Sequence, residues 1–168
     1  MAQITIREAL PKDAEAVLAC LKQAGGETDN LTFGSEGLPF TVEQERVFLQ
    51  EQQASDHGVF LCAWDGPHLV GTASLQPLPR RMHHRAELGI SVVKAYWGRG
   101  IGSQLLEQVI AYAKAHGIEL LNLDVRSDNV RAIHLYEKYG FCSIGTSPAY
   151  VKIGSQYADC VLMYLDLR

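Results

Sequence analysis

The sequence predicts an α/β domain of the α+β type, in which a mixed central sheet of about six to seven strands is flanked by about four helices. Three observations support this class. Alternating segments typical of strands recur along the chain, Asp65-Gly66 marks a hairpin turn, and residues 87–125 follow a strand–glycine loop–helix–strand order. The hairpin makes its strands antiparallel and the crossover makes its strands parallel and right-handed, so the sheet is mixed.

The chain is expected to begin with a strand followed by a helix. Residues Ile4–Glu8 alternate in the way of a strand, and Pro11 and Asp13 are typical of a helix start. This helix would bury Ala14, Val17, Leu18 and Leu21 and end at Gly25-Gly26. Residues 27–40 are rich in turn residues and are expected to form a loop.

A second helix is expected to begin at about residue 41. Thr41 can cap it and Gln44 can close a capping box, while Val47 and Phe48 are expected to be buried. The two strands of the hairpin follow, over Val59–Trp64 and Leu69–Leu75.

Residues 87–102 organise the rest of the chain. Leu88, Ile90 and Val92 alternate as one face of a strand, and a glycine-rich loop follows with Gly98, Gly100 and Gly102. A helical pattern starts at once and ends at Gly117; its apolar face consists of Ile101, Leu105, Leu106, Val109, Ile110 and Ala113.

The last part of the chain adds three strands and one helix. A strand is expected at Leu120–Val125 and a helix at Val130–Tyr139, capped by Ser127-Asp128-Asn129. Two final strands, Phe141–Thr146 and Ala158–Leu167, would complete the sheet.

The glycine loop predicts a phosphate site. The first N–H groups of a helix lack partners, the helix dipole is positive there, and glycine allows a ligand to come close to the backbone. The loop is not a Walker loop, because Ser103 and Gln104 stand where that motif needs Gly and Lys. Nor is it a dinucleotide fingerprint, because its third glycine position is Ser103.

Composition limits the classes of function. The 168 residues are 47% apolar with a net charge of −4, which suits one globular domain and disfavours nucleic acid as a partner. No apolar run is long enough to span a membrane, and the first eight residues lack the pattern of a signal peptide. The four scattered cysteines fit reduced thiols in the cytoplasm. No metal site is expected, since His83-His84 lacks spaced partner ligands.

Two segments and the order of elements resemble the GNAT superfamily of acetyl-CoA-dependent N-acetyltransferases. The segments read ISVVKAYWGRGIGSQLL and LDVRSDNVRAIHLYEKYGF. The usual family loop is Gln/Arg-x-x-Gly-x-Gly/Ala, and Trp97 takes its first position here. The resemblance covers nearly the whole chain and implies a GNAT-like sheet, a single N-acetyltransferase domain over residues 1–168, and acetyl-CoA as co-substrate.

The resemblance also implies which residues bind the cofactor. Ile90, Ser91 and Val92 would offer backbone groups to the pantetheine arm, and Asn129 would contact the cofactor near its thiol. The pyrophosphate would be held by the loop and first helical turn, namely Gly98, Arg99, Gly100, Ile101, Gly102 and Ser103.

Three residues are candidates for catalysis. Tyr136 matches the family's usual general acid, which would protonate the departing thiolate. Without the motif, Tyr136 would be interpreted as a tyrosine that packs in the core, as Tyr139 is. Glu87 and Asp124 are alternative bases that could take the amine proton through water. Glu87 could equally form an ion pair with Arg85, and Asp124 could accept hydrogen bonds from backbone N–H groups or support a helix cap.

The acceptor is expected to be the primary amine of a small cationic molecule, attacked directly in a ternary complex. Between residues 27 and 45 there are no Lys or Arg residues and five carboxylates, namely Glu27, Asp29, Glu36, Glu43 and Glu45. In this family that part of the chain covers the acceptor, so the carboxylates would favour a cationic amine. An ordinary solvated acidic surface would show the same pattern. One alternative is acetylation of a protein N-terminus or lysine, and another is a non-catalytic acyl-CoA-binding sensor. A homodimer is compatible with the sequence.

Overall fold

The computed structural model describes residues 3–168. Met1 and Ala2 lie outside this range, so the expectation that the first eight residues are not a signal peptide falls partly outside the described residues. Within that range the chain forms seven strands and four α-helices, as predicted. The strands are β1 (Ile4–Glu8), β2 (Val59–Asp65), β3 (His68–Pro77), β4 (Arg85–Val92), β5 (Leu120–Arg126), β6 (Cys142–Ile153) and β7 (Gln156–Asp166). The helices are α1 (Ala14–Glu27), α2 (Val42–Ala54), α3 (Ile101–Ala115) and α4 (Val130–Lys138).

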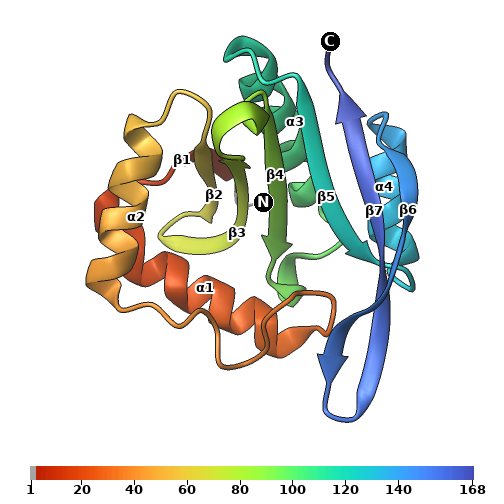
Figure 1. Cartoon of the computed structure of the whole chain (residues 1–168). Helices are drawn as coiled ribbons and strands as arrows, with labels where there is room; N and C mark the ends of the chain where they lie inside the picture. Colours follow the sequence, from red (N-terminus) through yellow and green to blue (C-terminus); the bar gives the residue numbers. More distant parts are fainter. Residues whose placement is uncertain (1–2) are drawn as a thin grey trace.

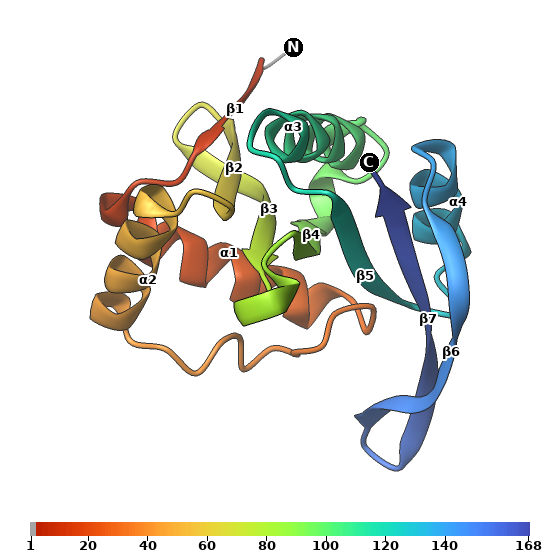
Figure 2. The same ribbon diagram turned by 45° about the horizontal axis from the view of Figure 1, so that its top comes forward.

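The strands form one mixed sheet in the order β1-β2-β3-β4-β5-β7-β6. Every neighbouring pair is antiparallel except β4 and β5, which are the two ends of the predicted crossover. This parallel pair is short, because only Arg85–Glu87 pair with Leu120–Asn122. Beyond Glu87 the two strands part, and Figure 2 shows the widening space between them. The sheet is therefore split at its middle on one side.

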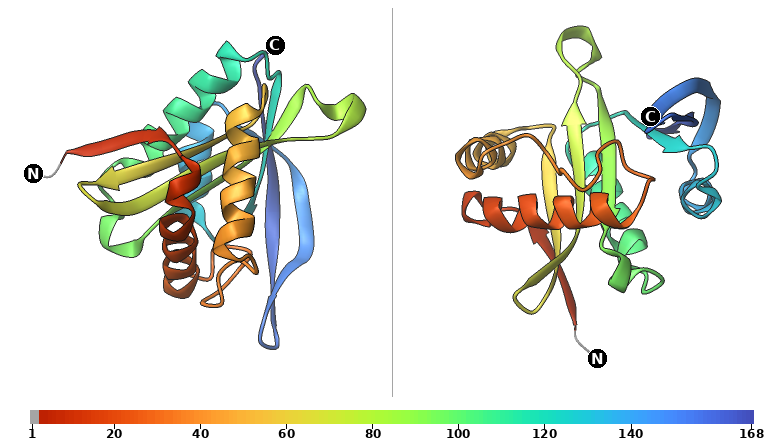
Figure 3. Two further views of the ribbon diagram at one scale, coloured as in Figure 1. Left: turned by 90° about the vertical axis from the view of Figure 1, so that its left-hand side faces the viewer. Right: turned by 90° about the horizontal axis from the view of Figure 1, so that it is seen from below.

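The helices lie in two layers (Figures 1 and 3). On one face α1 packs on β3 and β4 and α2 packs on β2, and a small core here includes Val17, Leu21, Leu49 and Phe60. On the other face α3 packs on β2, β3 and β4, and α4 lies behind β7. The main core on that face contains most of the buried apolar residues, among them Leu75, Leu105, Leu106, Leu121 and Met163.

Two predictions in the first half of the chain were wrong. Helix α1 does not end at Gly25-Gly26 but continues to Glu27. Gly25 is needed for packing: a Cβ at this position would lie 2.3 Å from the carbonyl oxygen of Gly34, so the loop after α1 crosses directly over it. In α2, the capping box of Thr41 and Gln44 is present, but Val47 is 46% exposed, and Leu49 is the buried apolar residue.

The last two strands are longer than predicted. β6 continues past Thr146 to Ile153 and β7 begins at Gln156, so the predicted gap of residues 147–157 is mostly strand. The register shifts between Ser147 and Val151, where Ala149 has a left-handed φ of 50°. This irregularity hides the alternation that marks a strand, and it places residues of the hairpin beside β5.

Within residues 3–168, no helix combines the length and the apolar composition that crossing a membrane requires.

The contact of Gly25 with the following loop gives a test of the fold. We expect Gly25→Ala to lower the free energy of unfolding by about 1–3 kcal/mol, because its methyl group would overlap the carbonyl of Gly34. Gly26→Ala is the matched control, since its Cβ would meet Ser35 Cβ at 3.4 Å. The control should gain about 0.5–1 kcal/mol from helix propensity. Urea unfolding measures both, and equal stabilities would contradict the packing role.

Candidate active site

A cavity of about 1340 Å³ occupies the space where β4 and β5 separate. It runs from the N-terminus of α3, along β4, to the inner side of α2. Every residue predicted from the sequence to be catalytic or to bind the cofactor lines this cavity, with the exception of Arg99. Segments far apart in the chain therefore meet at the split in the sheet.

The edge of β4 that faces the split has backbone groups without strand partners. In the antiparallel ladder with β3, Val93 N–H donates to the carbonyl of Val70, and the carbonyl of Arg85 accepts from Leu78 N–H. The backbone N–H and C=O groups of the odd-numbered residues of β4 therefore point to β3, and those of the even-numbered residues Ile90 and Val92 point toward the split. The backbone of Ser91 thus faces β3, and its hydroxyl forms a 2.9 Å hydrogen bond with the hydroxyl of Thr72.

The glycine loop brings a helix N-terminus to the cavity. Gly98 and Gly100 have φ of 75° and 78°, a conformation that side chains strain. Gly100 is the N-cap of α3 and has no side chain to bond the first turn. The N–H groups of the first turn, at Ile101, Gly102 and Ser103, therefore face the cavity end of the helix. This arrangement suits a phosphate group.

Contacts to other elements hold this loop in place. Tyr96 donates a 2.7 Å hydrogen bond to Asp65, and Lys94 N–H donates a 2.6 Å bond to the carboxylate of Glu27. The guanidinium of Arg99 lies 4.6 Å from the centre of the Tyr96 ring, which explains why Arg99 is not a cavity residue. These two hydrogen bonds connect the segment before the glycine loop to α1 and β2.

Trp97, which replaces the family's usual Gln or Arg, has a defined contact. Its indole N–H donates a 2.7 Å hydrogen bond to the carbonyl of Val92. Since the Val92 backbone points toward the split, the indole occupies one of the acceptors at the open edge of β4. The sequence pattern identified the departure at this position but not the bond.

Tyr136 lies on α4 and lines the cavity from the side opposite β4. Its ring packs against Phe141 with the ring centres 5.6 Å apart. Burial raises the pKa of Tyr136 to about 12, since the phenolate would lose its hydration. The hydroxyl therefore stays protonated over the physiological range. Tyr139, one turn along the helix, instead donates a hydrogen bond to Glu107 on α3.

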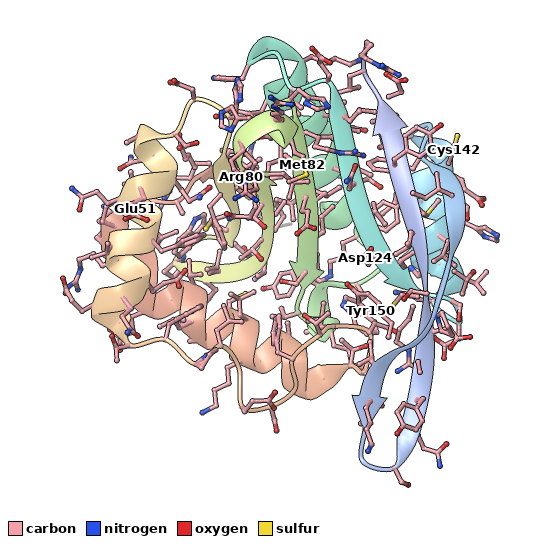
Figure 4. The ribbon with its side chains drawn as sticks, viewed as in Figure 1. Glu51, Arg80, Met82, Asp124, Cys142 and Tyr150 are labelled. Carbon is pink, nitrogen blue, oxygen red and sulfur yellow. The ribbon has the colours of Figure 1, made fainter. Side chains whose placement is uncertain are left out.

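The two carboxylates predicted as bases lie on neighbouring strands. Glu87 does not pair with Arg85, which instead donates a 2.9 Å hydrogen bond to Asn122. Asp124 accepts a 2.7 Å hydrogen bond from Tyr150, and Figure 4 shows the two side chains side by side. This bond, more than burial, raises the pKa of Tyr150 to about 12. Tyr150 was missed in the sequence, because it lies in the irregular part of β6.

The N-terminus of α4 completes the site. The side chain of Asn129 caps the helix by accepting a 3.3 Å hydrogen bond from Ala132 N–H, and Asn129 also lines the cavity. Arg131, in the first turn, approaches the glycine loop: its Nη2 lies 3.6 Å from the position of a Cβ on Gly98. A cationic group therefore lies beside the predicted phosphate site.

Residues 29–141 of the chain match the Acetyltransferase (GNAT) family. The chain belongs to this family. An acetyltransferase of the GNAT family from Streptococcus pneumoniae shares the fold with a TM-score of 0.95 and 34% identity, over 99% of this chain and 100% of the other. The L-amino acid N-acetyltransferase AaaT of Escherichia coli K12 is 30% identical over 97% of this chain and 98% of its own length.

The N-alpha-acetyltransferase RimI of Mycobacterium tuberculosis is 35% identical over 67% of this chain and 69% of its own length. The family and these relatives confirm the resemblance stated from the motifs. This GNAT protein is an acetyl-CoA-dependent N-acetyltransferase, and its acceptors are amines.

The phosphate loop offers a direct test. A side chain at Gly100 would meet no protein atom within 4 Å, and Gly100 lines the cavity, so we expect its Cβ to occupy space that the phosphates would take. We expect Gly100→Ala to weaken acetyl-CoA binding about 10-fold or more, measured by calorimetry, and Gly100→Val to weaken it further. Gly66→Ala is the matched control, because Gly66 also has a left-handed φ, 56°, and open space, in the β2–β3 turn. Both variants carry a similar backbone strain of about 1–2 kcal/mol. Equal loss of affinity in the two would remove the loop from phosphate binding.

Proposed function

We propose that this GNAT enzyme transfers the acetyl group of acetyl-CoA to the primary amine of a small cationic molecule, by direct attack in a ternary complex. The observation that carries the proposal is the division of charge along the cavity. Among the described residues that line it, the basic side chains, Arg131, His134 and Lys138, all lie on α4, and Arg131 approaches the phosphate loop. The acidic ones, Glu45, Glu87 and Asp124, line the rest. A cationic acceptor fits the acidic part, and the anionic cofactor fits the basic part.

The acidic segment seen in the sequence contributes less than its charge count indicates. Glu27 binds Lys94 N–H, Glu36 binds Gly34 N–H, and Glu43 pairs with Arg46 on the helix surface. Of the five carboxylates between residues 27 and 45, Glu45 lines the cavity. The proposal therefore rests on carboxylates from three different elements, and not on an acidic surface.

In the proposed mechanism the amine must first lose a proton, because an ammonium has no lone pair. Glu87 takes this proton through water, since its carboxylate has no ion-pair partner among residues 3–168. Asp124, held by Tyr150, orients the nitrogen. The nitrogen then attacks the thioester carbonyl, and an N–H at the open edge of β4 stabilises the developing oxyanion.

The C–S bond breaks as the amide forms, and Tyr136 protonates the thiolate. Its raised pKa keeps the hydroxyl protonated, although it is a weaker acid than an ordinary tyrosine. A free thiol is a stronger acid than Tyr136, so the proton is transferred while the C–S bond breaks and negative charge builds up on the sulfur. The second proton of the attacking nitrogen is released to solvent, and Tyr136 regains a proton from solvent. The products are the acetylated amine, coenzyme A and one released proton.

Replacement of Tyr136 tests this step. We expect Tyr136→Phe to lower kcat about 10²-fold with little change in acetyl-CoA affinity, because only the donor is removed. Tyr139→Phe is the control on the same helix and should keep the wild-type rate. Since the pKa of Tyr136 is raised to about 12, the wild-type rate should not fall from tyrosine ionisation below about pH 11. An unchanged kcat in Tyr136→Phe would exclude it as the acid.

A panel of acceptors tests the function itself. Release of coenzyme A is measured with polyamines, aminoglycosides and simple alkyl amines, and with peptides that carry a free N-terminus or lysine. We expect turnover on small amines at a kcat/KM at least 10-fold above that on peptides. Turnover on peptides alone would favour a protein acetyltransferase, in line with the RimI relative. Acetyl-CoA binding without turnover on any amine would favour a sensor.

We further propose a cytoplasmic enzyme. All four cysteines are free thiols, and burial raises the pKa of Cys20 and Cys62 to about 12, which makes them unreactive. We also propose that the enzyme forms a homodimer, which size-exclusion chromatography with light scattering tests.

A further inference from the structure

Glu45 is an unusual residue for its place in the fold. It lies on the face of α2 that packs toward the sheet, with Leu49 and Gln52, and it is 2% exposed. Amphipathic helices normally direct apolar side chains to this face, and glutamate is rarely buried unless it is paired. The Glu45 carboxylate has no hydrogen bond or ion pair to a residue within 3–168, and burial is the cause that raises its pKa.

An unpaired buried carboxylate costs stability, so it needs a partner to be retained as a charge. Residues 3–168 supply none, but Glu45 lines the cavity, and a ligand in the cavity can donate to it. This placement distinguishes Glu45 from Glu43, two residues earlier on the same helix, which pairs with Arg46 in solvent.

The part of the cavity around Glu45 has two kinds of wall. One wall is aromatic and comes from the α1–α2 loop, α2 and β2: it consists of Phe33, Phe40, Phe48 and Phe60. Phe48 and Phe60 meet edge to face with their ring centres 6.3 Å apart. The other wall is the polar face of β3, where Thr72, Ser74 and Gln76 alternate along the strand. A ligand here needs an apolar body and polar groups along one side.

We infer that Glu45 selects the acceptor: the enzyme acetylates amines that have an aromatic-sized apolar body and carry hydrogen-bond donors, and it rejects free amino acids. The inference rests on the proposed function and names the substrate class for that site. The α-carboxylate of an amino acid bound in the cavity away from α4 would face the carboxylates of Glu45, Glu87 and Asp124, and among the described lining residues no basic side chain there would offset the repulsion. The same groups attract an amide N–H or a second ammonium.

This specificity differs from what the name of one relative states. AaaT of Escherichia coli is an L-amino acid N-acetyltransferase and is 30% identical to this chain. Identity at this level shows the family but leaves the acceptor side free to differ. The contrast makes the matched acid the most informative negative probe.

The test compares three forms of one molecule: L-phenylalanine, L-phenylalaninamide and phenethylamine. The aromatic body stays the same and each molecule reacts through a primary amine, while the carboxylate is kept, made neutral or removed. Because the neighbouring group changes the pKa of the amine, kcat/KM is expressed per neutral amine. We expect the wild-type enzyme to use the amide and the amine with a kcat/KM at least 10-fold above that for the acid. Glu45→Gln, a conservative change at the wall, should reduce this ratio at least 3-fold by lowering turnover of the amide and raising that of the acid.

Glu43→Gln is the matched control and should keep the wild-type ratio. Acetyl-CoA affinity and the melting temperature are measured for both variants, so that a folding defect is separated from a change in specificity. An equal ratio in Glu45→Gln and Glu43→Gln would overturn the inference and leave the proposed function standing. Preference for the acid in the wild type would overturn both the inference and the cationic acceptor of the proposed function. Absence of turnover on all three and on the small amines of the wider panel would overturn both.

Discussion

The parting of β4 and β5 beyond Glu87 and Asn122 is the constraint on which the site depends. A sheet can tolerate such a split only if each strand keeps a full partner on its other side. Here β4 pairs with β3 over its whole length, and β5 pairs with β7 from Leu120 to Arg126. The open edge of β4 then presents backbone N–H and C=O groups to a ligand, since groups left unpaired in the protein must find partners elsewhere.

Electrostatics divide the resulting cavity into two parts. The N-terminus of α3 and the basic side chains of α4 make one end suitable for the phosphates of acetyl-CoA. Carboxylates from α2, β4 and β5 make the other end suitable for an amine. Tyr136 lines the same cavity, with its hydroxyl protonated because burial opposes ionisation. In the proposed function, the fold thus separates the two substrates by charge while the split brings them to a common point.

Much of the fold could be predicted because its signals are local. The alternation of β4, the glycine loop and the apolar face of α3 are adjacent in the chain, and the structure has them as predicted. The errors occurred where a distant contact decided the outcome. Gly25 looks like a helix end but lies under the Gly34 carbonyl, and Val47 fits an apolar face that the tertiary packing turns outward. Tyr150 gave no signal, because an irregular strand carries it to Asp124.

The amino-acid sequence by itself determined the family and, through the family, acetyl-CoA as co-substrate, because the motifs that carry the resemblance are local in the chain. It also predicted a phosphate loop, since the unpaired backbone amides at a glycine-rich helix start suit a phosphate. Only the tertiary structure decided which charges face the acceptor. Glu27, Glu36, Glu43 and Glu45 look alike in the sequence, yet three of them bind groups of the protein and Glu45 alone among these four lines the cavity. Whether a carboxylate is available to a ligand depends on which neighbours the fold brings to it, and a linear pattern does not contain that information.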